Sequence, residues 1–66
     1  MITYDVLWET LKEKGLKKQN LVDDFGLSKG MMDNLKHNRP ITTTTINDLC
    51  NFLNVTPDKI LTYKKD

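Results

Sequence analysis

The sequence has few of the features that mark secreted, membrane-spanning or disulfide-bonded proteins. Its one cysteine, Cys50, cannot form a disulfide within the chain, which fits a reducing compartment. Its apolar runs are far shorter than the ~20 residues that a helix needs to cross a bilayer. Met1 is followed by neither a basic segment nor an apolar stretch. We therefore expect no signal peptide and no membrane span, and a cytoplasmic protein.

The chain also lacks the groups that catalysis and metal binding need. It contains no nucleophile–base pair, no carboxylate pair placed for acid–base work and no glycine-rich phosphate loop. A chain of 66 residues leaves little room to enclose a substrate or to add a ligand-sensing domain. Its single histidine, His37, is not part of a cluster of metal ligands. We expect no enzymatic activity, no cofactor, no metal ion and no small-molecule effector site.

Charge is nearly balanced over the whole chain but not within it. Ten basic and nine acidic residues give a formal net charge of +1, which does not by itself indicate a nucleic-acid-binding protein. From Lys12 to Arg39, however, there are seven basic and four acidic residues. This local excess of positive charge lies in the middle of the chain rather than in a tail, so the distribution of charge is more informative than the total.

Short amphipathic helices dominate the first half of the sequence. A first helix is predicted over 4–14, because four apolar residues recur at helical spacing and Gly15 supplies a left-handed terminator. A second helix is predicted over 17–25 and ends at Gly26. The apolar residues of the first helix are Tyr4, Leu7, Trp8 and Leu11, and those of the second are Leu21, Val22 and Phe25.

Three further helix starts are marked by capping residues. Ser28 is a good N-cap for a third helix that ends at Asn38, since asparagine tolerates left-handed geometry and Arg39 precedes a proline. Thr42 is the predicted N-cap of a fourth helix with Ile46, Leu49, Cys50 and Leu53 on its inner face. Thr56 followed by Pro57 predicts the start of a short fifth helix.

Together these elements predict a compact, all-α, five-helix bundle formed by a single domain over 1–66. The second and third helices are joined through Gly26 and Leu27. A steep helix crossing needs one residue that tolerates positive φ and one apolar residue beneath the turn, and these two supply both. The sequence thus predicts a helix-turn-helix over about 17–38. Residues 2–4 and 61–63 could pair as small terminal strands.

The order of residues from Leu16 to Leu53 resembles the Cro/C1-type (XRE) family of helix-turn-helix transcriptional regulators. The similar stretches are "LKKQNLVDDFGLSKGMMDNLKHN" and "TTTTINDLCNFLNVTPDKIL". The beginning "MITYDVLWETLKEKG" and the tail "DKILTY" resemble a short single-domain branch of that family. The resemblance covers nearly the whole chain, and it implies a lambda-repressor-like fold and binding to double-stranded DNA.

In the family the third helix enters the major groove and the second helix braces the phosphate backbone. Rotation by about 100° per residue also places one polar arc of the third helix opposite Met31, Met32 and Leu35. The resemblance implies that the base-facing residues are Lys29, Gly30, Asp33, Asn34 and, at the far end, His37. Phosphate contacts are expected from Lys17, Lys18, Ser28, Lys36 and Arg39.

Gly30 and Asp33 depart from what a DNA-reading helix usually presents. Gly30 costs up to about 1 kcal/mol relative to alanine, less in a first turn, but its missing side chain could let the backbone approach DNA closely. The Asp33 carboxylate would repel phosphate. It could accept a hydrogen bond from the amino group of cytosine, or it could bridge Lys29 and Lys36 within the helix.

A few phosphate contacts per subunit give weak and strongly salt-dependent binding, so useful specificity implies a homodimer on a two-fold operator. The sequence therefore favours a DNA-binding transcriptional regulator, with a repressor that occludes a promoter as the expected form. The alternative is a protein-interaction module built on the same scaffold, which the low net charge, Gly30 and Asp33 would allow. Candidate dimer surfaces are the apolar residues left outside the core: Ile2, Tyr4, Phe52, Leu61 and Tyr63.

Overall fold

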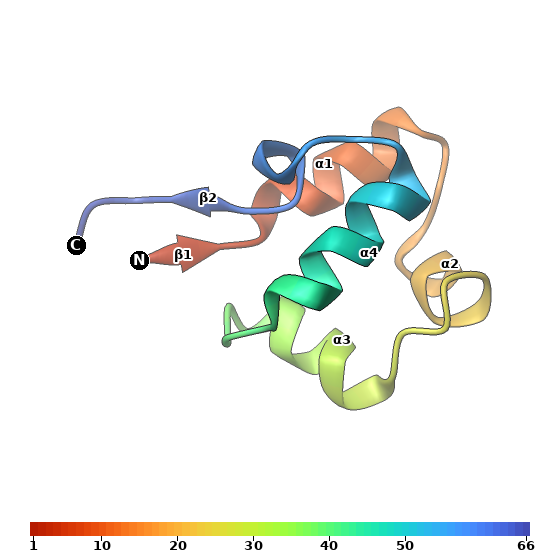
Figure 1. Cartoon of the computed structure of the whole chain (residues 1–66), viewed down its shortest axis with the longest axis horizontal. Coiled ribbons are helices and arrows are strands. Elements are labelled where there is room, and N and C mark those ends of the chain that lie inside the picture. The colour runs from red at the N-terminus through yellow and green to blue at the C-terminus, as the bar shows by residue number, and fades with distance from the viewer.

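The computed structural model describes residues 1–66 and contains four α-helices, one 3₁₀ turn and a two-stranded sheet (Figure 1). Helix α4 crosses the middle of the molecule, with α1 on one side and α3 on the other (Figure 1). The elements in chain order are β1 (Ile2–Thr3), α1 (Asp5–Glu13), α2 (Lys18–Asp23), α3 (Lys29–Lys36), α4 (Thr43–Leu53), η1 (Pro57–Lys59) and β2 (Thr62–Tyr63).

The expected fifth α-helix is only a 3₁₀ turn, so the five-helix prediction is wrong in its count. In η1 the Lys59 N–H donates to the Thr56 carbonyl and the Ile60 N–H to the Pro57 carbonyl, both three residues back. Thr56 does precede the turn, but its hydroxyl donates to the Asp58 carboxylate instead of capping the backbone. Proline and threonine mark where a helix can begin, whereas its length depends on the residues that follow. Here the chain leaves the turn after Ile60 and enters β2.

The terminal strands are present, and they make the fold mostly helical rather than purely α-helical. β1 and β2 pair antiparallel, with Ile2 opposite Tyr63 and Thr3 opposite Thr62. The hydroxyls of the two threonines lie 3.1 Å apart. The N-terminal ammonium of Met1 donates to the Lys64 carbonyl at 2.5 Å, so the two ends of the chain lie side by side (Figure 1).

Helix ends fall where the sequence supplies residues that tolerate left-handed geometry. Gly15, Gly26 and Asn38 have φ values of 70°, 86° and 55°, as the predicted terminators require. After α3, the Arg39 N–H donates to the Asn34 carbonyl at 2.8 Å, which reverses the chain direction at Asn38. Asn54 ends α4 in the same way, with a φ of 56° that the sequence analysis did not predict.

Ten apolar side chains form one buried core beneath these helices. Leu27 lies in it under the turn between α2 and α3, as predicted, and is only 6% exposed. Met32 is buried in the core, and Met31 is partly buried at its edge. Trp8 and Cys50, predicted on inner faces, are only partly buried. The core residues are Tyr4, Leu7, Leu11, Leu21, Leu27, Met32, Leu35, Leu49, Leu53 and Ile60.

Candidate nucleic-acid interface

The position of α3 is fixed at its start by a cap and a tight turn. The Ser28 hydroxyl accepts a hydrogen bond from the Met31 N–H at 3.1 Å, so the predicted N-cap forms. Gly26 has positive φ, and the Leu27 N–H donates to the Leu21 carbonyl at 2.9 Å. These contacts join α2 to α3 with little freedom between them, as a helix-turn-helix requires.

One face of α3 is polar and open, and the structure brings the expected base-facing residues together on it. Lys29, Gly30 and His37 are exposed, and Asp33 and Asn34 are half-buried. His37 is the C-cap of α3 rather than a helical residue. The opposite face carries Met32 and Leu35 into the core. The division between the two faces follows the predicted helical spacing.

Gly30 is not required by packing within the protein. A Cβ atom added to Gly30 would have no heavy atom within 4 Å, and its φ is not in the left-handed region. The glycine therefore leaves a gap in the side chains of the outward face at the first turn of α3. That gap would allow a partner to approach the backbone closely.

Asp33 is engaged by residues that follow the helix, not by lysines within it. Its carboxylate lies 2.6 Å from Nη1 of Arg39 and 3.1 Å from Nδ1 of His37. No ion pair joins Asp33 to Lys29 or Lys36, so the predicted bridge within α3 is wrong. The left-handed Asn38 reverses the chain and brings Arg39 back over the last turn of α3.

Further basic side chains expected to contact phosphates lie at the start of α2 and the end of α3. Lys17, Lys18 and Lys36 are exposed. The Lys18 ammonium lies 4.4 Å from the centroid of the Trp8 ring, a cation–π contact that the sequence analysis did not identify. Such a contact contributes about 0.5–1 kcal/mol at an exposed site. It holds the lysine against α1.

A groove of about 230 Å³ separates α2 from α3 on the same side of the molecule. Gln19 lies in this groove and was not predicted as a site residue. Its amide nitrogen donates to the Asp23 carboxylate at 3.0 Å, one helical turn further along α2. In the sequence, the four-residue spacing between Gln19 and Asp23 could have predicted this contact, because such pairs face each other on a helix. The groove is lined by Gln19, Val22, Lys29, Met32, Asp33 and Lys36.

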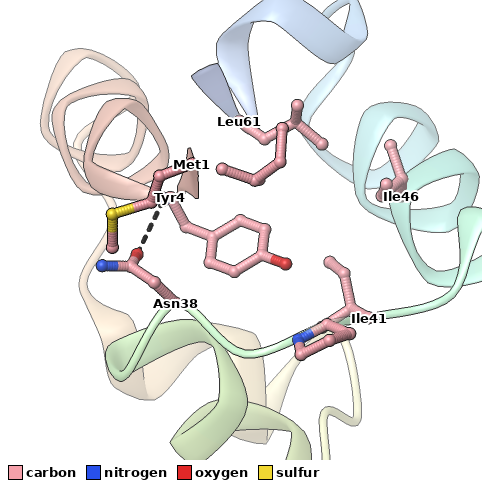
Figure 2. Close-up of a pocket in the computed structure, with 8 residues that line it drawn as sticks. Met1, Tyr4, Asn38, Ile41, Ile46 and Leu61 are labelled. Carbon is pink, nitrogen blue, oxygen red and sulfur yellow. Dashed lines mark hydrogen bonds between the residues drawn. The ribbon is translucent and has the colours of Figure 1, made fainter. Parts of the chain in front are cut away.

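Tyr4 supports the other end of α3 from the N-terminal segment. Its backbone N–H donates to Oδ1 of Asn38 at 3.0 Å (Figure 2). Its hydroxyl donates to the Arg39 carbonyl at 2.7 Å. Burial raises the pKa of the Tyr4 hydroxyl, an effect partly offset by a backbone hydrogen bond from Ile41. Because Tyr4 is only 3% exposed, its assignment to a dimer surface is wrong.

Tyr4 lines a second, more apolar cavity. Its volume is about 440 Å³, and six of its eight lining residues are hydrophobic. Figure 2 shows Tyr4 between Asn38 on one side and Ile41 and Leu61 on the other. Of the remaining candidates for a dimer surface, Ile2 and Leu61 line this cavity. Ile2, Phe52 and Tyr63 are 41%, 37% and 66% exposed.

No cluster of three or more histidine, cysteine, aspartate or glutamate side chains lies in a position to hold a metal ion. None of the helices combines the length and the apolar character that a bilayer crossing demands.

Comparison with known proteins agrees with this geometry. A family model described as a Cro/C1-type HTH DNA-binding domain matches residues 6–66. The chain is also similar to the crystal structure of the transcriptional regulator VanUg, with a TM-score of 0.91 and 26% sequence identity over 98% of this chain and 87% of that chain. No curated protein sequence matches it. Because the family model spans nearly the whole sequence, the chain belongs to the family of Cro/C1-type helix-turn-helix DNA-binding domains.

Proposed function

We propose that this protein is a sequence-specific transcriptional regulator that inserts α3 into the major groove of double-stranded DNA. The observation that carries the proposal is the polar face of α3, which presents Lys29 and Asn34 at its two edges and Asp33 and Gly30 between them. The similarity to a transcriptional regulator supports the same function. We propose that residues 1–66 act as one domain without enzymatic activity, in the cytoplasm and on the nucleoid.

The chemistry of the exposed side chains suggests how contacts divide between bases and phosphates. Lys29 can donate to guanine and Asn34 can form a bidentate pair with adenine. Lys17, Lys18 and Lys36 are point charges suited to phosphate, and Ser28 retains a hydroxyl proton while it caps α3. His37 and Asp33 complete the base-facing arc.

About four phosphate contacts per subunit give a slope of about −4 in log affinity against log salt concentration. A single domain of this kind binds weakly at physiological salt. We therefore propose a homodimer that places two copies of α3 in successive major grooves, about 34–36 Å apart, on a two-fold operator. Occupation of such an operator within a promoter would repress transcription.

A protein-interaction module remains the second candidate. The net charge of +1 and the Asp33 carboxylate on the α3 face favour it. The pairing of Asp33 with Arg39 counts against it, because this partner compensates the charge that would otherwise repel phosphate. The two functions differ in one measurable property, namely a preference for particular DNA sequences.

The proposal is tested by selecting binding sites from a random double-stranded DNA pool at physiological salt. We expect a two-fold symmetric site with a steep salt dependence, and a dimer on DNA by analytical ultracentrifugation. The variant Lys29→Ala/Asn34→Ala should lose the sequence preference while remaining folded. The matched control Lys59→Ala/Asn51→Ala makes the same changes at exposed positions on η1 and α4 and should keep the preference. Recovery of no preferred site would favour the protein-interaction module.

A further inference from the structure

Arg39 is held at three points, although it lies outside α3. Its N–H donates to the Asn34 carbonyl at 2.8 Å and its carbonyl accepts from the Tyr4 hydroxyl at 2.7 Å. Its guanidinium donates to the Asp33 carboxylate through Nη1 at 2.6 Å. An arginine side chain with several rotatable bonds is normally mobile at a surface. Here both its backbone and its charged end have defined partners.

The ion pair lies on the face proposed to meet DNA. Asp33 belongs to the outward arc of α3, and the side chains of Asp33 and Arg39 are 50% and 55% exposed. An ion pair this exposed contributes little to folding stability. The pair instead positions the Arg39 guanidinium, which belongs to a residue beyond the end of α3, beside Asp33 in the middle of the polar arc.

The pairing also changes which DNA groups suit Arg39. A guanidinium has five N–H donors, so donors remain after Nη1 binds Asp33. The adjacent carboxylate disfavours a phosphate, which carries a full negative charge. It does not disfavour O6 and N7 of guanine, which are uncharged acceptors and the usual bidentate partners of arginine.

We propose that Asp33 is a positioning residue that presents Arg39 to a guanine, in place of the phosphate contact expected for Arg39 from the sequence. The inference rests on the proposed DNA-binding function and adds a specificity-determining residue to it. His37 lies beside the pair, with its Nδ1 3.1 Å from the other carboxylate oxygen of Asp33 and 3.0 Å from the Asp33 backbone carbonyl oxygen.

The test measures the affinity of each variant for the selected site and for copies with one base pair changed at a time. Arg39→Ala should abolish discrimination at one G·C pair per half-site, a loss of roughly 5- to 150-fold for a bidentate contact. Asp33→Asn should lose the same discrimination although Arg39 is present, and the double variant should lose no more. Arg39→Lys keeps the charge but loses the planar fork that pairs with both Asp33 and guanine, so its discrimination at that base pair should fall well below that of the wild type. Lys36→Ala is the control and should weaken binding to all fragments alike.

Two results would overturn the inference while leaving the proposed function intact. One is tighter binding by Asp33→Asn to every fragment with unchanged base preferences, which would make Asp33 only a repulsive charge. The other is a loss of discrimination in Asp33→Asn at a C·G pair that Arg39→Ala still recognises, which would make Asp33 itself the base contact. A wild-type chain with no base preference would instead overturn both proposals. Thermal unfolding of each variant shows whether these exposed substitutions leave the fold unchanged.

Discussion

The Tyr4 hydroxyl lies 2.7 Å from the carbonyl oxygen of Arg39, although 35 positions separate the two residues in the chain. The N–H of the same tyrosine donates to the side chain of Asn38. The segment before α1 thus braces the turn that ends α3. Stability at the N-terminus and geometry at the proposed DNA-binding surface are linked through one aromatic residue.

We predict that Tyr4→Phe lowers the free energy of unfolding by about 0.5–1.5 kcal/mol, because it leaves the Arg39 carbonyl without its donor in a partly buried site. Urea denaturation measures this change. Tyr63→Phe is the matched control, since Tyr63 is 66% exposed and its hydroxyl has no partner in the protein. Equal effects of the two substitutions would contradict the assigned role of the Tyr4 hydroxyl.

Gly30→Ala is expected to stabilise the protein, by less than about 1 kcal/mol, because alanine is the better helix former and its Cβ meets open space. The same substitution should weaken DNA binding if the backbone of α3 approaches the bases at that turn. Thermal unfolding and DNA binding are measured on the same sample. Gly26→Ala provides the contrast and should destabilise, since Gly26 has a φ of 86°.

Removal of the N-cap of α4 by Thr42→Ala should cost about 1 kcal/mol of folding stability. The Thr42 hydroxyl accepts a hydrogen bond from the Thr45 N–H at 3.2 Å, and no other side chain caps that end. Thr44→Ala removes an exposed threonine two residues along and makes no capping contact, so it should be neutral or slightly stabilising. Circular dichroism and urea denaturation measure helix content and stability for both variants. A larger loss of stability in Thr44→Ala than in Thr42→Ala would contradict the prediction.

Alkaline pH should destabilise the fold through Cys50. Burial, and to a smaller extent the nearby Asp58 carboxylate, raise the pKa of the Cys50 thiol above its ordinary value. The stabilisation from the neutral thiol is therefore complete below the unfolded-state pKa and is lost as pH rises through the folded-state pKa. Over that pH interval, the free energy of unfolding of the wild type should fall relative to that of Cys50→Ala. Iodoacetamide should also need a higher pH to alkylate Cys50 in the native chain than in urea, and Asp58→Asn should narrow that gap.

DNA binding should change the fluorescence of Trp8, the only tryptophan. The Lys18 ammonium lies over the Trp8 ring, and a phosphate that draws it away would alter the environment of the indole. Lys18→Met keeps a long side chain without the charge, so its fluorescence should respond much less to added DNA. A full response in Lys18→Met would show that the signal comes from elsewhere.

Local signals in the sequence predicted the local features of this fold correctly. Gly15, Gly26 and Asn38 have the left-handed geometry expected of them, and Ser28 and Thr42 cap their helices. Each of these outcomes depends on a few neighbouring residues and on backbone sterics. The fifth predicted helix is shorter than expected. The Thr56–Pro57 pair marks where a helix can begin, but it does not tell where packing makes the chain leave that helix.

Contacts between distant segments could not be derived in the same way. Helical spacing suggested that Asp33 could pair with two lysines of α3, but its partner is Arg39. Arg39 reaches Asp33 because the left-handed Asn38 reverses the direction of the chain. Helical spacing placed Tyr4 among the apolar residues of the first predicted helix, over 4–14, but Tyr4 was also named as a candidate for the dimer surface. Its burial and its hydrogen bonds to Asn38 and Arg39 show that it belongs to the core, and these contacts form only when the whole chain has folded.

The pairing of β1 with β2 also bears on how this chain could be engineered. The Met1 ammonium lies 2.8 Å from the Asp66 carboxylate, so a short glycine linker could join residue 66 to residue 1 and make the backbone circular. New ends could then be opened in the exposed turn at Gly15, between α1 and α2. Such a circular permutant would keep the order of helices in space while it changed their order along the chain.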